Sequence, residues 1–425
     1  MPPLSCFQGY CVVDVVIDAL GAAGDGLAVA PDGARLFLPG VLPGERVQVE
    51  GPVVLSPSPD RVDPPCPHYG PCGGCVTQHL ALGPYSAWKR GRLVEALERA
   101  GFRDVPVAAT EVTPPATRRR ADLALRRRPD GSVALGFHAR GDSARVEDLS
   151  TCFVLDPRLV ALFEPLRAML RSLPSLRREG SAMLNLLDSG PDLLLRLDGT
   201  PGVQERTALA AFAKAQGIPR IAGTSLKGTV SETLAQLGPV SIAFAGVPVA
   251  PPPGAFLQAT PQGEAAIVRA VLAGLPKKLT GKARIAELHA GLGTLSFPLS
   301  AAARVAAYES APEAVAALDA AARKSGGRVV ATKRDLVRQP LAPKELEAFA
   351  ALVLDPPFSG AAEQMPALAR SSLGRIVYVS CNPAALTRDA KVLLGGGWRI
   401  EAATPIDQFL WSAQLEAVVV FAKGK

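Results

Sequence analysis

The stretch Arg375-Ile-Val-Tyr-Val-Ser-Cys-Asn-Pro383 is a run of apolar β-formers that stops abruptly at a cysteine, an asparagine and a proline. It predicts a buried strand that has just ended, because proline cannot extend a sheet ladder and Asn-Pro favours a turn. With a helix expected to begin near Ala384, Cys381 lies at the carboxyl edge of the strand, where open α/β sheets place their chemistry. A thiol there is nucleophilic if its pKa is lowered, although a lone cysteine is more often a small buried hydrophobe.

The C-terminal part of the chain alternates strand and helix patterns, which predicts a mostly parallel, doubly wound, Rossmann-like α/β sheet. Gly291 and Gly293 follow the first strand in a turn that lets a ligand approach the backbone. Glu309, Asp335 and Asp355 follow the next three strands, so they are expected at the same sheet edge. The expected strands are 284–288, 305–308, 328–331, 351–354, 375–379, 399–402 and 416–421.

Three motifs, Ser380-Cys-Asn-Pro383, Leu352-Val-Leu-Asp-Pro-Pro357 and Ala286-Glu-Leu-His-Ala-Gly-Leu-Gly-Thr294, together resemble those of the RNA uracil-C5 methyltransferases. That family uses S-adenosylmethionine on a class I methyltransferase sheet. The resemblance implies a cofactor site that includes a Phe-Gln segment before the catalytic domain. Its implied residues are Gln258, His289, Gly291, Gly293, Thr294, Glu309, Asp335 and Asp355.

The resemblance also implies the two catalytic residues. C5 of uracil is not nucleophilic, so it must be activated covalently, and Cys381 is the implied nucleophile that adds to C6. Glu416 is the implied base that removes the C5 proton, and burial beside apolar neighbours would raise its pKa toward neutrality. The chain departs from the family pattern at Phe358, where arginine is usual, and at Gln414, where histidine is usual. His289-Ala290 also replaces the common Phe-Cys.

Residues 10–55 contain short alternating runs separated by turn signals, which predicts a small β-barrel. The segment Gly24-Asp-Gly-Leu-Ala28 with the Pro-Gly turns that follow resembles the TRAM domain, an OB-like RNA-binding module. A generic barrel without a ligand is the alternative. A proline-rich connector follows, so the first domain is expected to span residues 1–58.

Cys66, Cys72 and Cys75 form a C-x5-C-x2-C set whose glycines let the backbone fold around a small object. Thiolates at this spacing bind iron or zinc, and Cys152 is the candidate fourth ligand. From the ligands alone, a four-thiolate zinc site is a serious alternative. The family resemblance implies a [4Fe-4S] cluster instead, which we favour.

Residues 59–250 are expected to form a central α+β domain that carries the cysteine set, and residues 251–425 the methyltransferase domain. Within the central domain, the arginine-dense strands at 117–128 and 136–140 are a candidate RNA face. A solvated charged surface is the bland alternative.

The 425 residues carry a net charge of +7, which suits a polyanionic partner. No export signal and no apolar run long enough to span a bilayer is evident, so we expect a cytoplasmic protein, as a monomer. Within the family that the chain resembles, a TRAM-like barrel together with the cysteine set implies the ribosomal branch, and so methylation of a uridine in 23S rRNA. The alternatives are uridine in tRNA, and a non-catalytic RNA-binding or assembly protein with the same fold.

Overall fold

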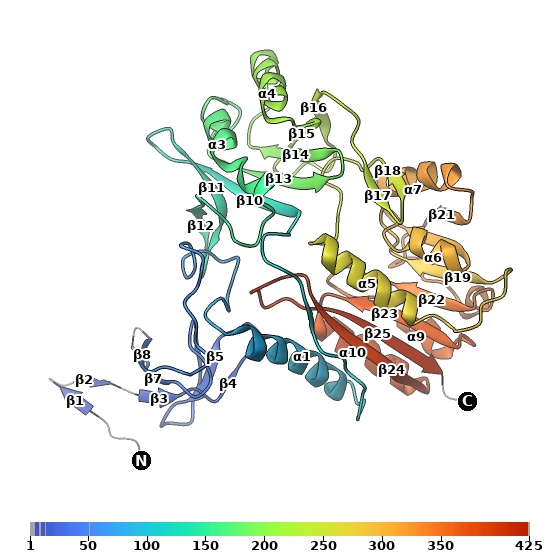
Figure 1. Ribbon diagram of the computed structural model, residues 1–425, viewed down its shortest axis with the longest axis horizontal. Helices are drawn as coiled ribbons and strands as arrows, with labels where there is room; N and C mark the ends of the chain where they lie inside the picture. Colours follow the sequence, from blue (N-terminus) through green and yellow to red (C-terminus); the bar gives the residue numbers. More distant parts are fainter. Residues whose placement is uncertain (1–4, 8–9, 13, 51, 424–425) are drawn as a thin grey trace.

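The structure, a computed structural model, describes residues 5–7, 10–12, 14–50 and 52–423, and its N-terminal part is blue in Figure 1. After a hairpin of β1 (Ser5–Phe7) and β2 (Tyr10–Val12) come two three-stranded antiparallel sheets that share a core of Val15, Ile17, Ala28 and Val47. The short strands expected here are present, and closure into a TRAM-like barrel remains a prediction. The two sheets are β3-β7-β8 (Asp14–Val16, Arg46–Gln48, Val53–Ser56) and β4-β5-β6 (Ala19–Leu20, Gly26–Val29, Arg35–Leu38).

A seven-stranded sheet forms the centre of the chain, and only β14 and β15 pair in parallel in it. Leucines of these strands and of the helices α2 (Pro157–Val160), α3 (Phe163–Arg171) and α4 (Val203–Gln216) form one apolar core. This is the α+β arrangement expected for the region. In spatial order the strands are β12 (Asp142–Asp148), β11 (Val133–Ala139), β10 (Arg120–Arg127), β13 (Glu179–Leu187), β14 (Gly190–Leu197), β15 (Arg220–Ser225) and β16 (Glu232–Gln236).

The C-terminal sheet has the order β21-β20-β19-β22-β23-β25-β24-β9. The five strands from β21 to β23 are parallel, and β25 runs antiparallel to β23. Chain order reverses between β19 and β22, which creates a switch point at their carboxyl ends. The strands are β21 (Val329–Lys333), β20 (Arg304–Glu309), β19 (Arg284–Leu288), β22 (Ala351–Leu354), β23 (Arg375–Ser380), β25 (Glu416–Lys423), β24 (Trp398–Asp407) and β9 (Glu111–Val112).

Helices cover both faces of this sheet. Alternate residues of one strand enter different cores, with Ile376 and Tyr378 in one and Val377 and Val379 in the other. Burial on both faces explains why these strands are continuous apolar runs rather than alternating ones. The helices are α5 (Pro261–Ala273), α6 (Ser296–Ala302), α7 (Pro312–Lys324), α8 (Pro343–Leu346), α9 (Met365–Arg370) and α10 (Pro383–Gly395), and a hairpin of β17 (Ile242–Phe244) and β18 (Val247–Val249) precedes them.

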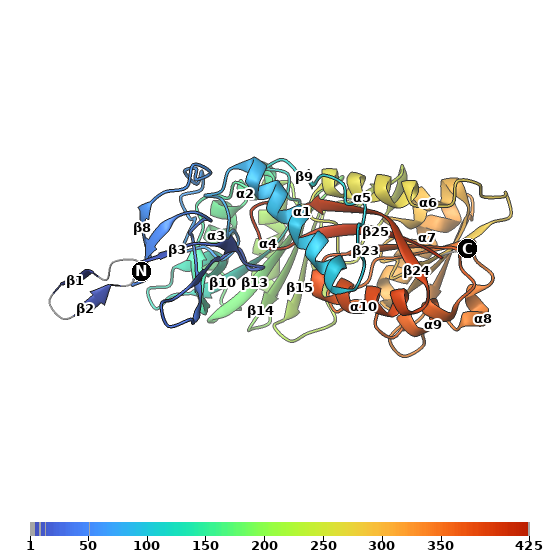
Figure 2. The ribbon, with the colours of Figure 1, turned by 90° about the horizontal axis from the view of Figure 1, so that it is seen from below.

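Helix α1 (Leu82–Arg99) belongs by its packing to the C-terminal sheet, although its sequence lies within the expected central domain. Its buried residues Leu93 and Leu97 join the core beneath α10 and β24, and β9 then pairs with β24 at the sheet edge. Figure 2 shows α1 crossing this side of the sheet. The division at residues 58 and 250 remains a prediction, since the polypeptide crosses between units at α1.

Candidate active site

Cys381 lies between the end of β23 at Ser380 and the start of α10, as the sequence predicts. The side chain of Asn382 caps the helix by accepting a hydrogen bond from Ala384 N over 3.0 Å, and Pro383 occupies the first helical turn. Cys381 is partly buried. Burial, with the negative charges of Glu416 and Asp355, raises the pKa of its thiol to about 12. The resting side chain is therefore a neutral thiol at pH 7.

The two carboxylates reach Cys381 along neighbouring strands. Because Ser380 pairs with Ala417 in the antiparallel β23–β25 ladder, Glu416 lies beside Cys381, and Asp355 follows β22 on the other side of β23. Burial raises the pKa of Asp355 to about 7 and, with the charge of Asp355, raises that of Glu416 well above its ordinary value. The structure thus brings together the predicted nucleophile Cys381, the predicted base Glu416 and a second carboxyl group, that of Asp355.

Glu416 has one bonded and one free oxygen. Its Oε2 accepts a hydrogen bond from Gln408 Nε2 over 2.9 Å. Its Oε1 is buried and has no hydrogen-bond partner among the described residues. A buried carboxylate oxygen without a donor is costly unless a ligand completes it, so this atom is the one available to take a proton.

Gln258 was expected to contact the cofactor, and in the structure its side chain lies between Asp355 and Gln408. Its Nε2 donates to Asp355 Oδ2 over 3.1 Å, and its Oε1 accepts from Gln408 Nε2 over 2.7 Å. The two glutamines therefore connect Asp355 to Glu416 by a continuous series of hydrogen bonds.

A carboxylate, that of Glu309, bonds the backbone of the glycine turn after β19. Glu309, at the end of β20, accepts a hydrogen bond from Gly291 N over 2.9 Å. Gly291 has a φ of 53°, and a Cβ there would meet no atom within 4 Å, so the backbone borders open space. Gly293 has a φ of 94°, and a Cβ there would collide with Leu318 and Phe297. The turn fits a cofactor that lies directly on the backbone.

The other predicted cofactor residues surround this turn. His289 is in the left-handed region with a φ of 63°, and burial lowers its pKa. Thr294 is half-buried just before α6. Asp335 is exposed and accepts hydrogen bonds from the backbone N–H groups of Val337 and Arg338, over 3.1 and 3.2 Å. A contact of any of them with a ligand remains a prediction.

The four predicted metal-binding cysteines line one cavity of about 260 Å³. Burial raises the pKa of Cys75 to about 12, and neighbouring cysteines add to the shift. Within the residues that the structure describes, no group of three or more His, Cys, Asp or Glu side chains is arranged to hold a single metal ion. His68 bonds Glu147 and Ser150, and His79 bonds Tyr69, so both histidines are engaged elsewhere. The four cysteines therefore line one cavity, which could hold a ligand between them.

The arginine-rich segment 117–128, which includes β10, has part of its charge in ion pairs and hydrogen bonds within the chain, and its role as an RNA face remains a prediction. Arg119 is buried against Glu264, and Arg126 and Arg128 form ion pairs with neighbouring acids. Arg127 donates to backbone carbonyls near the end of α3. Alternation along the strand could not reveal these partners, since they come from other elements.

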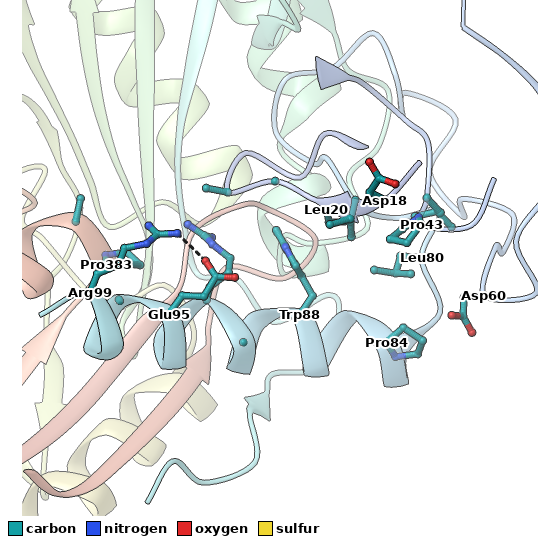
Figure 3. A pocket seen from close by; sticks show the side chains of 18 of the residues that line it. Asp18, Leu20, Pro43, Asp60, Leu80, Pro84, Trp88, Glu95, Arg99 and Pro383 are labelled. Atoms are coloured by element: carbon teal, nitrogen blue, oxygen red, sulfur yellow. Dashed lines mark hydrogen bonds and ion pairs between the residues drawn. The ribbon is translucent and has the colours of Figure 1, made fainter. Parts of the chain in front are cut away.

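A groove of about 550 Å³ runs along α1 and ends at the start of α10, where Pro383 is labelled in Figure 3. The N-terminal sheets form one side, through Asp18 and Leu20, and Asn382 and Pro383 close its far end. Figure 3 shows Trp88 rising from α1 into it. The groove that the N-terminal unit helps to build therefore ends at the two residues that follow Cys381 in the sequence.

Several buried polar residues near the site were not expected from the sequence. Gln408 and Asp407 follow one another at the end of β24, and Tyr85 and Lys89 of α1 both bond Asp407. The only signal was their polarity within apolar surroundings. Spacing alone could not pair residues that are more than three hundred positions apart.

None of the helices in the described part of the chain has the length and apolar composition needed to cross a membrane.

The profile of the tRNA (uracil-5-)-methyltransferase family matches residues 262–424. The chain is 40% identical over 421 residues to an uncharacterized RNA methyltransferase of Brucella suis, covering 97% of this chain and 98% of that protein. It is 36% identical over 435 residues to the 23S rRNA (uracil(1939)-C(5))-methyltransferase RlmD of Chromohalobacter salexigens, covering 96% and 88%.

The fold is also similar to a solved structure, the Pyrococcus abyssi tRNA (uracil-54, C5)-methyltransferase in complex with S-adenosyl-L-homocysteine. The TM-score is 0.71 at 20% identity, covering 96% of this chain and 99% of that one. With the sequence relatives at 36–40% identity over nearly the whole chain, the family is established. The chain belongs to the S-adenosylmethionine-dependent RNA uracil-C5 methyltransferases.

Proposed function

We propose that the protein methylates C5 of a specific uridine in 23S rRNA through a covalent adduct between Cys381 and C6. The observation that carries this proposal is the cysteine at the end of β23 beside a buried carboxylate, Glu416, that keeps one oxygen free. A nucleophile and a base within reach of one carbon–carbon double bond are what this reaction needs.

In this mechanism the Cys381 thiol gives its proton to Asp355 as its sulfur forms a bond to C6 of the uracil. The electron pair of the C5–C6 double bond moves onto the C4 carbonyl, which makes C5 an enolate carbon. S-adenosylmethionine would supply the methyl group: as C5 forms its bond to the methyl carbon, the bond from that carbon to the sulfonium sulfur breaks, and S-adenosylhomocysteine is the leaving group. Glu416 Oε1 then takes the C5 proton, the S–C6 bond breaks, and the double bond re-forms. Because the target base must leave its stack, the substrate is a flipped or unpaired uridine.

For the cofactor we propose the cleft at the switch point between β19 and β22. The open backbone at Gly291, held by Glu309, supports this position. The residues that we propose to border it are Gln258, His289, Gly291, Gly293, Thr294, Glu309, Asp335 and Asp355.

For the four cysteines we propose a [4Fe-4S] cluster. Zinc needs four sulfurs about 2.3 Å from one ion. Here Cys66, Cys72, Cys75 and Cys152 line one cavity, and the family resemblance favours the cluster over a four-thiolate zinc site. A cluster would join residues 66–75 covalently to Cys152, which lies after β12.

The rRNA assignment is supported by the relative whose name includes 23S rRNA, which is 36% identical over nearly the whole chain. Uridine in tRNA is the second candidate, because the family profile and the structural neighbour both carry tRNA in their names. In either case, we propose that RNA flanking the target enters the groove along α1.

The covalent step is tested with RNA that carries 5-fluorouridine at the target, together with S-adenosylmethionine. Fluorine at C5 blocks the final elimination, so a denaturation-resistant protein–RNA complex is expected with the wild type and none with Cys381→Ala. Absence of the complex in a wild-type protein that binds both RNA and cofactor would contradict the proposal and favour a non-catalytic RNA-binding protein.

A further inference from the structure

Gln408 is held in one orientation by its hydrogen bonds. It is only 1% exposed. Its Oε1 accepts from the backbone N–H of Ala259 over 2.8 Å, so this atom must be the carbonyl oxygen. Its Nε2 is therefore the end that points to Glu416 Oε2, at 2.9 Å, and to Gln258 Oε1, at 2.7 Å. Both N–H groups and the oxygen are used, so the side chain has no freedom to turn over.

The backbone that carries Gln408 is anchored on both sides. Asp407, buried at the end of β24, accepts hydrogen bonds from Lys89 Nζ over 2.9 Å and from the Tyr85 hydroxyl. Lys89 Nζ also donates to the carbonyl of Gln414, near the other end of the segment that links β24 to β25. One helix therefore fixes both ends of the segment that runs from Gln408 to Glu416.

The donor from Gln408 has two effects on the carboxylate. It stabilises the ionised form, which burial and the charge of Asp355 oppose. It also occupies Oε2, so the remaining oxygen, Oε1, is the one that faces the site without a partner. The side chain of Gln414, which stands where the family usually has histidine, is exposed and makes no hydrogen bond to Glu416 among the described residues.

We propose that Gln408 is a positioning residue for the base: it fixes Glu416 so that Oε1 takes the C5 proton, and it links that carboxylate through Gln258 to Asp355. This inference rests on the proposed methyl-transfer mechanism and adds a residue to it. It acts in the last stage, proton removal and elimination, and not in the formation of the adduct.

The test compares Gln408→Met with Gln364→Met. Gln364 is a matched control, because it is a glutamine of the same domain, 2% exposed and with both amide ends bonded, to Leu341 N and O. With ordinary uridine RNA, Gln408→Met is expected to lower kcat by about 10-fold or more, with the KM values for RNA and cofactor unchanged. Gln364→Met should leave kcat near the wild-type value.

Two further readouts separate positioning from simple damage. Loss of a donor to the ionised form raises the pKa of Glu416, so the acidic limb of the kcat–pH profile should move to higher pH in Gln408→Met. The variant should still trap 5-fluorouridine RNA, since the adduct forms before proton removal. If the wild type itself fails to trap, the proposed mechanism fails. If the wild type traps but Gln408→Met keeps its kcat and profile, or loses trapping as well as turnover, the role given to Gln408 is overturned.

Discussion

At the scale of single residues, Cys381 shows the main chemical constraint of the site. Burial and two negative neighbours raise the pKa of its thiol, so the thiolate fraction is small at neutral pH. As the pH rises toward that pKa, the thiolate fraction increases about tenfold per pH unit. The Cys381 thiol is therefore a weak nucleophile before the substrate binds. The condition for a reactive thiol, a lowered pKa, is therefore not met in the substrate-free site.

That constraint predicts the pH dependence of thiol alkylation in the RNA-free protein. Cys381 should react slowly with iodoacetamide at pH 7, and its rate should still be rising at pH 10. Glu416→Gln removes a negative neighbour and so lowers the thiol pKa, which should speed alkylation above pH 9. Mass spectrometry of the peptide that contains Cys381 measures the rate. The exposed Glu363→Gln is the control, and equal rates in all three proteins would contradict the electrostatic coupling of Cys381 to Glu416.

At the scale of elements, the segment between β24 and β25 links the cysteine cavity to the catalytic base. Leu410 and Ser412 line that cavity. The carbonyl of Trp411, a non-glycine residue with a φ of 60°, accepts backbone hydrogen bonds from Val76 over 2.7 Å and Thr77 over 3.1 Å, directly after Cys75. A change in the order of residues 66–77 should therefore change the position of Glu416.

This linkage predicts that loss of the cysteine site loosens the segment. Cys75→Ser, or removal of bound iron by a chelator, should increase amide hydrogen exchange in residues 408–415. Exchange in α9, which lies away from this contact, should stay unchanged as the internal control. Increased exchange throughout the protein would indicate general unfolding, and unchanged exchange in residues 408–415 would contradict the linkage.

Elements also show how far the sequence could lead. The strands β19 and β22 have the bounds that their apolar runs predict. Asp355 and Cys381 meet because the parallel strands β22 and β23 end at one edge, and Glu416 joins them because the antiparallel strand β25 begins at that edge. The attachment of α1 to the catalytic sheet could not be predicted, since helical periodicity identifies a buried face and not what covers it. Gln408 was missed for a similar reason: two of its partners, Gln258 and Ala259, lie 150 and 149 positions earlier in the chain.

In the molecule as a whole, the N-terminal and C-terminal units meet around one groove, which ends at Asn382 and Pro383, the two residues after Cys381. The N-terminal sheets, helix α1 and the start of α10 all contribute to it (Figure 3). In the arginine-rich segment that is the expected RNA surface, Arg119 is buried against Glu264, whereas Arg126 and Arg128 form ion pairs that remain partly exposed. RNA selection is therefore expected to depend on the groove as well as on the net charge of +7.

The central claim is tested most directly by methyl transfer from labelled S-adenosylmethionine to unmodified 23S rRNA and to unmodified tRNA, with Cys381→Ala as the control. We predict labelled 5-methyluridine in the 23S rRNA, abolished by the substitution. Label in tRNA alone would replace the rRNA assignment with the tRNA one. No label in either RNA, from a protein that binds the cofactor and carries its cluster, would contradict the catalytic account.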